Sequence, residues 1–528
     1  MHGRTLAGTL AFFLAAPLLG QSLEEKVSEF TLPNGFRFLI VERHESPVFV
    51  GLVRFKVGSV DEVPGITGLA HLFEHMVFKG TTAIGTRAWE KERAVLDEIE
   101  RVGEALSRAV VEGDEETVKA LREELEALEE KHQTLIVPGE FDTVYDENGG
   151  TFLNATTGAD LTTYFVALPS SRLELWMLME SERFKHPVMR EFYKERDVVA
   201  EERRMRIETS PGGALYEALI HAAFTVHPYR IETVGYMSDL KTVTVGDAEK
   251  FFAEHYVPQN SVVALVGDVD PAHAAELAQK YFSDIPKAPD PPPVRTVEPE
   301  QKGERRVRLE FDAEPGLMVA YHVPTWPDED FYALRALSYA LTEGRASRLE
   351  KALVKEGVAS DVDAWFGPGE RYPHLFMLSA DPIAPHTTEE VERILYREFE
   401  RLEREPLTKR ELERVRNNLQ ANAVRRLGSN FWLAFSMTEY ELLTGSWRNM
   451  LTYVDKVGSV TAEDVQRAAK AYLTESNRTV AVRVRRAVKG AEGAERMRAS
   501  VFSAPSVPSA LGFGWLYPAE PARETDAP

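Results

Sequence analysis

The stretch GLAHLFEHMVFKGT, residues 68–81, organises the rest of this chain. On a helix, His71 and His75 are four residues apart and project from one face, with Glu74 on the same side. This His-x-x-Glu-His order is typical of an inverted zinc-site pattern. It predicts two imidazole ligands for Zn²⁺, with Glu74 as the base that takes a proton from the bound water. A surface helix that carries two histidines by chance remains the alternative until a third ligand is found.

Composition narrows the classes of function. The chain has 528 residues, a formal net charge of −22 and no cysteine. Its length suggests about two to four domains. The acidic balance argues against nucleic acid as a partner. Without cysteine, disulfides, iron–sulfur clusters and thiol catalysis are excluded, so any metal must be held by histidines and carboxylates.

The two ends of the chain differ from the rest. Residues 1–20 combine a short basic start with an apolar run, which predicts a secretory signal peptide; an uncleaved anchor is the alternative. No later segment is apolar for long enough to span a bilayer. We therefore expect no membrane span after signal cleavage and an exported protein, periplasmic or extracellular. Residues 491–528 are expected to form a loosely packed tail, which is rich in Pro and Ala from about Ser503 onward.

The chain between these ends divides into two halves at a proline-rich stretch. We expect a first domain over residues 23–285, a linker over 286–302 and a second domain over 303–490. The second domain repeats the first in outline, with a strand, a helix and a closing apolar strand. It contains no second His-x-x-Glu-His, so the metal chemistry is expected in the first domain alone.

Residues 86–135 are charged and favour helix, with apolar residues at helical spacing on either side of Glu112-Gly113-Asp114. This pattern predicts an antiparallel helical hairpin. An interaction arm or a lid is possible for such a segment, but a solvated helical pair is the commoner role for this composition.

Further carboxylates follow the hairpin. Residues 148–157 and 161–169 are rich in β-branched and aromatic residues and predict a β-hairpin. The next helical segment carries Glu195 and Glu202, which are seven residues apart and share one face. One of them could complete the zinc site and another could orient a ligand. From pattern alone, a helix of Glu and Arg pairs is the favoured reading.

Several motifs in this order resemble the M16 peptidases, which include pitrilysin, insulysin and mitochondrial processing peptidase, and most closely their half-length members. The matching motifs are GLAHLFEHMVFKGT, then Asn154-Ala155, then ERDVVAEER at residues 195–203. The resemblance implies that Glu202 is the third zinc ligand, that Glu195 supports the site, and that the strand of Asn154 and Ala155 lies beside the substrate backbone.

The resemblance also implies the fold. We expect an α+β protein of the LuxS and mitochondrial processing peptidase type, with two homologous domains. Each would be an antiparallel sheet with helices packed on one face. His75 and Glu202 are farther apart in sequence than is usual in the family, and the surplus matches the helical hairpin at 86–135. We therefore read the hairpin as an insertion, which can enter without displacing the ligands because its ends lie close together.

A second departure concerns substrate binding. M16 proteins often carry an Arg and a Tyr seven residues apart in a metal-free domain, where they hold the substrate opposite the zinc. Here Leu353 and Ser360 take those positions. We therefore expect a dimer, possibly a heterodimer in which an M16-like partner chain supplies the Arg and Tyr and the two chains enclose the active site.

The expected function is zinc-dependent endopeptidase activity on peptides or unfolded segments inside a closed chamber. Two alternatives stay open at this point. One is a catalytically silent structural or assembly subunit of an M16-type complex. The other is a peptide-binding module in which the hairpin at 86–135 is the functional part.

Overall fold

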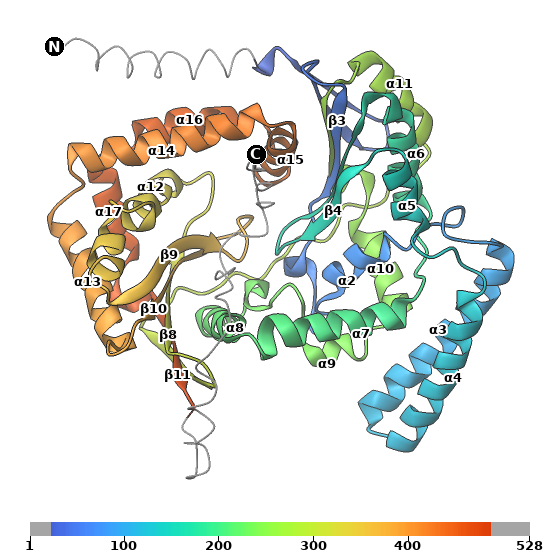
Figure 1. The fold of residues 1–528 in the computed structure, drawn as a ribbon, viewed down its shortest axis with the longest axis horizontal. Helices are drawn as coiled ribbons and strands as arrows, with labels where there is room; N and C mark the ends of the chain where they lie inside the picture. Colours follow the sequence, from blue (N-terminus) through green and yellow to red (C-terminus); the bar gives the residue numbers. More distant parts are fainter. Residues whose placement is uncertain (1–22, 487–528) are drawn as a thin grey trace, which may run out of the picture.

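The computed structural model describes residues 23–486, which form two halves, each with one β-sheet and several helices (Figure 1). The predicted signal peptide at 1–20 and tail at 491–528 lie outside the described residues. Within 23–486, no helix combines the length and apolar character that crossing a membrane requires.

Each half contains one sheet, and the two sheets share a topology. The first has the order β1-β2-β6-β3-β5-β4, and the second has the order β7-β11-β8-β10-β9. Apart from β1, the strands correspond one to one. In each sheet one pair is parallel, β2 with β6 and β7 with β11, and the other pairs are antiparallel. The predicted α+β fold of two related domains is confirmed, with one parallel pair in each sheet.

The strands have the following bounds. In the first sheet they are β1 (Val27–Thr31), β2 (Arg37–Glu42), β3 (Val48–Phe55), β4 (Thr151–Thr157), β5 (Thr162–Pro169) and β6 (Ser261–Gly267). In the second they are β7 (Arg305–Phe311), β8 (Gly316–Val323), β9 (Ala359–Gly367), β10 (His374–Pro382) and β11 (Arg478–Arg485).

Helices cover one face of each sheet. The described helices of the first half are α2 (Leu69–Met76), α3 (Trp89–Glu112), α4 (Glu115–Gln133), α5 (Glu140–Glu147), α6 (Leu173–Lys185), α7 (Phe192–Arg203), α8 (Pro211–Ala223), α9 (Met237–Leu240), α10 (Val245–His255) and α11 (Pro271–Phe282). Those of the second are α12 (Asp330–Thr342), α13 (Thr388–Arg404), α14 (Lys409–Gly428), α15 (Asn430–Thr444), α16 (Asn449–Ser459) and α17 (Ala462–Tyr472). Between the halves, residues 286–302 form no helix or strand.

The second face of each sheet is covered by a helix from the other half. In the first sheet, Leu52 and Val50 pack against Leu433 of α15. In the second sheet, Met318 and Ala320 pack with α8, whose buried residues include Leu219 and Ile220. Both faces of the central strands are therefore dry, which explains why every residue of β6 is buried. Because α8 and α15 each pack on the sheet of the other half, the two halves are joined through apolar cores.

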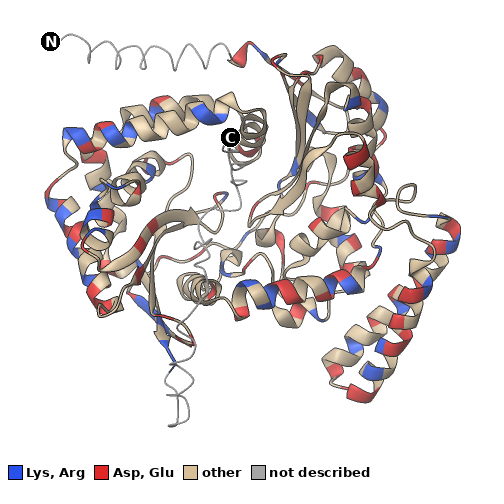
Figure 2. Cartoon of the chain, in the orientation of Figure 1, with Lys and Arg blue, Asp and Glu red and all other residues tan. Residues whose placement is uncertain are grey.

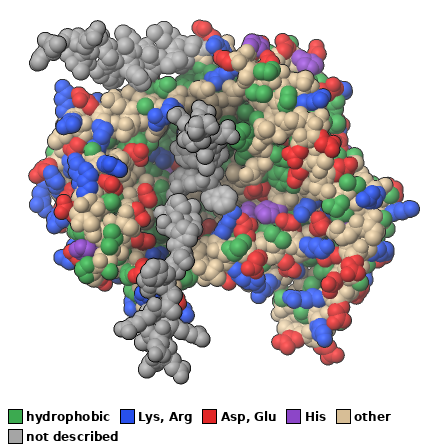
Figure 3. All heavy atoms as spheres, viewed as in Figure 1, with side chains coloured by type: hydrophobic (Ala, Val, Ile, Leu, Met, Phe, Trp, Pro, Cys, Tyr) green, Lys and Arg blue, Asp and Glu red, His purple; other side chains and the backbone are tan. Residues whose placement is uncertain are grey.

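The predicted helical hairpin is present as α3 and α4. Gly113 ends α3 with a φ of +72°, a conformation that favours glycine, and the Asp114 side chain accepts a hydrogen bond from the Thr117 backbone N–H at the start of α4. The pair extends away from the rest of the molecule (Figure 1) and carries acidic and basic side chains along its length (Figure 2). Acidic and basic residues are likewise interspersed over the face seen in Figure 3.

The base of the hairpin is tied to the first domain by buried charges. Glu92 of α3 is fully buried, and its Oε1 lies 3.1 Å from the His132 ring of α4 and 2.6 Å from Nε of Arg190. Arg190 also donates to the backbone carbonyls of Lys79 and Thr81, just after α2. The hairpin therefore projects into solvent while its root contacts the segment that follows the histidine motif.

Candidate metal centre

The histidine motif forms α2, a helix buried on most sides. Gly68 precedes it with a φ of +86°, and a Cβ there would lie 2.5 Å from the Val234 carbonyl oxygen, so the close approach requires glycine. The carboxylate of Glu62 accepts hydrogen bonds from the backbone N–H groups of Gly68 at 2.8 Å and Ala70 at 2.7 Å. These bonds satisfy donors that the first turn of a helix leaves free, and they fix where α2 begins.

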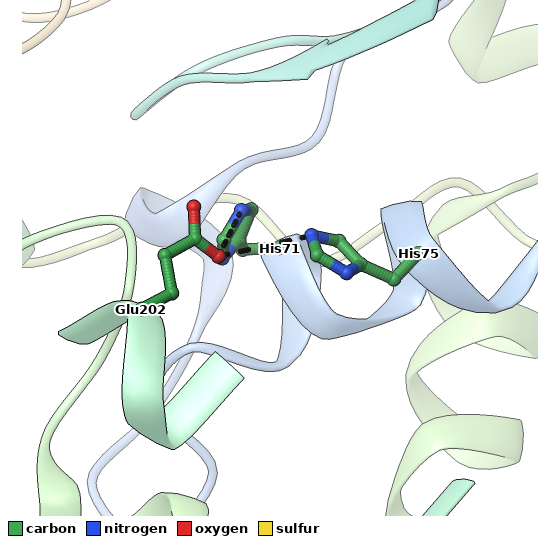
Figure 4. Close-up of side chains that lie close together, drawn as sticks. All are labelled: His71, His75 and Glu202. Atoms are coloured by element: carbon green, nitrogen blue, oxygen red, sulfur yellow. Dashed lines mark ion pairs between the residues drawn. The ribbon is translucent and has the colours of Figure 1, made fainter. Parts of the chain in front are cut away.

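Three side chains converge beside α2 (Figure 4). Nε2 of His71 lies 3.6 Å from Oε2 of Glu202, and Nε2 of His75 lies 3.9 Å from the same oxygen. One ligand atom from each residue fits within a 4.8 Å group. Tetrahedral ligands at ordinary zinc distances lie about 3.4 Å apart, so this set fits a metal ion with little movement. The structure thus brings together the three predicted ligands, His71, His75 and Glu202.

Hydrogen bonds and burial act differently on the two histidines. Nδ1 of His75 lies 2.8 Å from Oε1 of Glu195. An ionised carboxylate can only accept, so Nδ1 donates this hydrogen bond and Nε2 is the ring nitrogen directed at Glu202. Burial on its own would lower the pKa of His75, but the hydrogen bond and charge of Glu195, with the other carboxylates nearby, outweigh it and raise the pKa. Burial, with the charges of His75 and Arg206, lowers the pKa of His71 to about 3 and keeps that imidazole neutral.

The carboxylate that orients His75 is itself held. Burial on its own would raise the pKa of Glu195, but hydrogen bonds from His75 and Lys79 outweigh it and bring the pKa to about 2. The Lys79 ammonium lies 2.7 Å from Oε2 of Glu195. Lys79 lies within the stretch 68–81, but the sequence pattern alone indicates no role for it.

Glu202 has a second partner that sequence reasoning missed. Nη2 of Arg206 lies 2.5 Å from Oε1 of Glu202, which leaves Oε2 directed at the histidines. The spacing of four residues on a helical segment was a usable signal for this pair. Glu62 gave no comparable signal because its partners are backbone N–H groups.

The predicted base, Glu74, lies on α2 at the wall of a cavity. Burial raises the pKa of Glu74, which favours its proton-bearing form relative to an exposed glutamate. The cavity has a volume of about 410 Å³ and lies between α2, the segment 136–139 that leaves the hairpin, and β4. The cavity is lined by apolar side chains, which are Phe78, Ile136, Val137, Pro138 and Leu153, and by further charged ones, which are Lys79, Asp142, Arg190, Glu191 and Glu195. It is large enough for a side chain of a bound peptide.

Asn154 and Ala155 lie on β4, the edge strand of the first sheet. The strand bulges where its register shifts between Thr151 and Asn154, and Phe152 in the bulge has a φ of +57° and is 67% exposed. Beyond the bulge, the outer edge of β4 has no strand partner within the described chain. An extended peptide could pair with such an edge by backbone hydrogen bonds.

Comparison with known proteins adds to this geometry. Residues 38–128 match the family model described as insulinase, peptidase family M16, and residues 242–419 match the peptidase M16 inactive domain. A zinc protease named PqqE from Helicobacter pylori is 28% identical over 483 residues, which cover 90% of this chain and 96% of that protein. An uncharacterized zinc protease of Streptomyces coelicolor is 24% identical and covers 84% of this chain and 86% of that one.

Solved structures give the same result for the fold. The crystal structure of a protease from Helicobacter pylori matches with a TM-score of 0.74 and 27% identity, covering 87% of this chain and 99% of that one. The first half of the periplasmic protease PqqL from Escherichia coli matches with a TM-score of 0.63 and 17% identity, covering 87% and 92%.

The α+β fold is duplicated, and its first half holds a set of potential metal ligands. These two features together are typical of a two-domain metallopeptidase. The chain belongs to the M16 peptidase family. The two family models together span His71, Glu74 and His75 but neither reaches residues 195–203. The assignment of Glu195 and Glu202 therefore depends on the geometry above.

The bond between His75 and Glu195 generates a prediction about metal affinity. Replacing Glu195→Gln removes the charge that holds Nδ1 of His75, and affinity for a divalent metal ion should fall about 10- to 100-fold. Competition with a chromophoric chelator measures this affinity. Glu201→Gln, an exposed change on the same helix, is the matched control and should leave it unaltered. Equal affinity in both variants would show that Glu195 does not support the site.

Proposed function

We propose that this protein is a zinc-dependent endopeptidase that hydrolyses peptides or unfolded segments, with His71, His75 and Glu202 as the metal ligands. The observation that carries the proposal is the convergence of two imidazole nitrogens and one carboxylate oxygen within 4.8 Å. Two nitrogens and one oxygen with an open fourth position form a donor set that zinc takes in hydrolytic sites. The relatives named as zinc proteases support the choice of metal.

The chemistry follows from the positions of the side chains. Zinc held there supplies a Lewis acid that lowers the pKa of water and polarises a carbonyl oxygen. Glu74, on the same face of α2 as the two histidines, takes the proton from the attacking water and returns it to the leaving amine. Glu195 keeps Nδ1 of His75 protonated through the cycle, so the imidazole stays oriented.

The substrate is proposed to bind in extended form along β4, with Asn154 and Ala155 beside its backbone. The edge position of β4 supports this placement. The cavity beside Glu74 then accepts one substrate side chain near the scissile bond. Its walls combine apolar side chains with charged ones, which suits a residue with an apolar body and a polar end.

The chain is proposed to act with a partner. Leu353 is fully buried in the second core, and the Ser360 hydroxyl donates to the Asp381 backbone carbonyl at 3.3 Å. Neither side chain offers the cation or the phenol that the family uses to hold substrate. We infer a dimer that encloses the active site, possibly a heterodimer with an M16-like chain that supplies the Arg and Tyr.

We propose that the protein is exported, because residues 1–20 have the composition of a signal peptide. The PqqL structures, which resemble this fold, are described as those of a periplasmic protease. A periplasmic or extracellular location would expose the enzyme to peptides and unfolded segments outside the cytoplasm. Detection of the processed chain in a periplasmic or secreted fraction tests this assignment.

Two substitutions separate metal binding from catalysis. Glu74→Gln should retain one zinc per chain and lose at least about a hundredfold in peptide hydrolysis, because it removes the base and leaves the ligands. Glu202→Gln should lose zinc because a neutral amide is a poorer ligand. Metal analysis and a peptide-cleavage assay on both proteins measure these effects. Full activity in either variant would overturn the assignment, and a metal-free wild-type chain would favour a silent assembly subunit.

The partner proposal predicts that the purified chain alone cleaves peptides poorly. Adding a candidate M16-like partner should raise cleavage and the mass in solution together, because substrate binding needs groups that this chain lacks. The control is the same partner with its Arg and Tyr replaced by Ala, which should assemble without restoring cleavage. Full efficiency in the isolated chain contradicts the proposal.

A further inference from the structure

The second half contains a cavity lined by aromatic side chains. It has a volume of about 230 Å³ and lies between α12, α14, α15 and α16. Helix α12 follows β8 as α2 follows β3, so this cavity and the candidate metal centre lie beside corresponding helices of the two halves. The walls of this aromatic cavity include Trp326, Tyr332, Trp432, Tyr440 and Tyr453. The volume suits one large side chain, and the walls favour an aromatic one.

The charged groups at the aromatic cavity are matched with one another. Glu370 forms an ion pair with Arg335. Burial raises the pKa of Glu439, and three arginines act against this shift, which are Arg54, Arg426 and Arg335. The cavity therefore holds carboxylates and guanidinium groups together, and its aromatic walls favour an uncharged ligand. The oxygens of Glu439 can accept a hydrogen bond from such a ligand, for example from an indole N–H.

The C-terminal segment of the chain has the composition of such a ligand. Residues 487–528 lie outside the described range, and residues 511–517 within them read LGFGWLY, with three aromatic side chains. No acidic or basic residue occurs between Arg498 and Glu520. An uncharged aromatic segment of this kind gains free energy from a surface that removes it from water.

The chain leaves the second sheet at a defined point and is long enough to reach the aromatic cavity. Strand β11 ends at Arg485, and the Arg486 backbone N–H donates to the Phe311 carbonyl at 3.0 Å. Residues 487–510 span up to about 80 Å when extended, whereas a compact domain of the size of residues 303–486 is roughly 40 Å across. A tethered segment also binds at an effective concentration that a separate peptide rarely reaches. The chain's own C-terminal segment is therefore favoured as the occupant.

The aromatic cavity lies at the boundary of the two halves. Helix α15 supplies Phe435 to its wall and also packs on the first sheet. The guanidinium carbon of Arg54, on β3, lies 3.8 Å from the centre of the Phe435 ring. The backbone N–H of Glu370, which also lines the cavity, donates at 2.6 Å to Asp160 in the turn between β4 and β5. A segment held in this cavity therefore lies close to both halves.

We propose that the aromatic cavity is the docking site for residues 511–517 of the same chain, with Trp515 as the side chain that enters it. Trp515 has the largest aromatic surface of this segment, and its indole N–H can donate to Glu439. Docking holds the C-terminal segment at the boundary between the halves. The inference goes beyond the proposed function, because docking needs neither zinc nor hydrolysis.

Cross-linking in the full chain tests this docking, because the chain has no cysteine and each introduced thiol is unique. Leu516→Cys is combined with Ala423→Cys at the cavity wall, and a short bismaleimide joins the two thiols. The control combines Leu516→Cys with Ala471→Cys, at an exposed position on α17 of the same half. Intrachain cross-linking should be at least about tenfold faster in the first pair, because a docked segment keeps its thiol near the cavity. Gel mobility gives the rate, and mass spectrometry of the digested protein identifies the joined residues.

Substitution of Trp515 separates docking from chance encounter. Adding Trp515→Ala to the first pair should reduce its cross-linking rate to that of the control pair. Trp515→Phe should keep most of the difference, because it retains an aromatic ring. Leu443→Cys, at another wall of the cavity, replaces Ala423→Cys if that variant does not fold.

Three results would overturn the proposal. They are equal rates in the two pairs, a fast rate that survives Trp515→Ala, and a product that joins two chains, which would identify a second copy as the occupant. Zinc content is measured on the same samples. Fast intrachain cross-linking in a chain that binds no zinc supports the docking and counts against the proposed function alone.

Discussion

The position of α2 depends on a carboxylate that the fold buries at its first turn. Burial raises the pKa of Glu62 to about 8, so its charge is costly there, and the two backbone N–H groups and the positive end of the helix offset that cost. At the other end, Arg190 binds three carbonyls of residues 79–84. A helix held at both ends presents His71 and His75 in fixed positions, which is the condition for a metal site that needs little rearrangement.

The duplicated architecture explains why one half can carry the chemistry and the other can serve a different purpose. Helix α8 of the first half covers one face of the second sheet, and α15 of the second half covers one face of the first sheet. Both halves must therefore be present for either sheet to be buried on both faces. This packing constrains the residues of the two sheets. It does not constrain the residues between α2 and α7 or between α12 and α14, so these can differ between the halves. The first half holds two imidazoles and a carboxylate there, and the second holds the aromatic cavity.

Local patterns in the sequence were enough to predict some features and not others. The spacing of His71, Glu74 and His75 predicts the site because all three lie on one short helix. The hairpin follows from helical periodicity on both sides of Gly113. Glu202 was reached through family resemblance, since pattern alone favoured a helix of ion pairs. Glu62 and the aromatic cavity were missed, because both depend on contacts between segments far apart in sequence, which only the folded chain brings together.

We propose that residues of α2 and α7 together bind one zinc ion. Anomalous diffraction at the zinc edge, from crystals of the purified chain grown with zinc, tests this proposal. We expect one strong peak per chain, within about 2.3 Å of Nε2 of His71, Nε2 of His75 and Oε2 of Glu202. No peak at that position, or a peak coordinated by other residues, would contradict it.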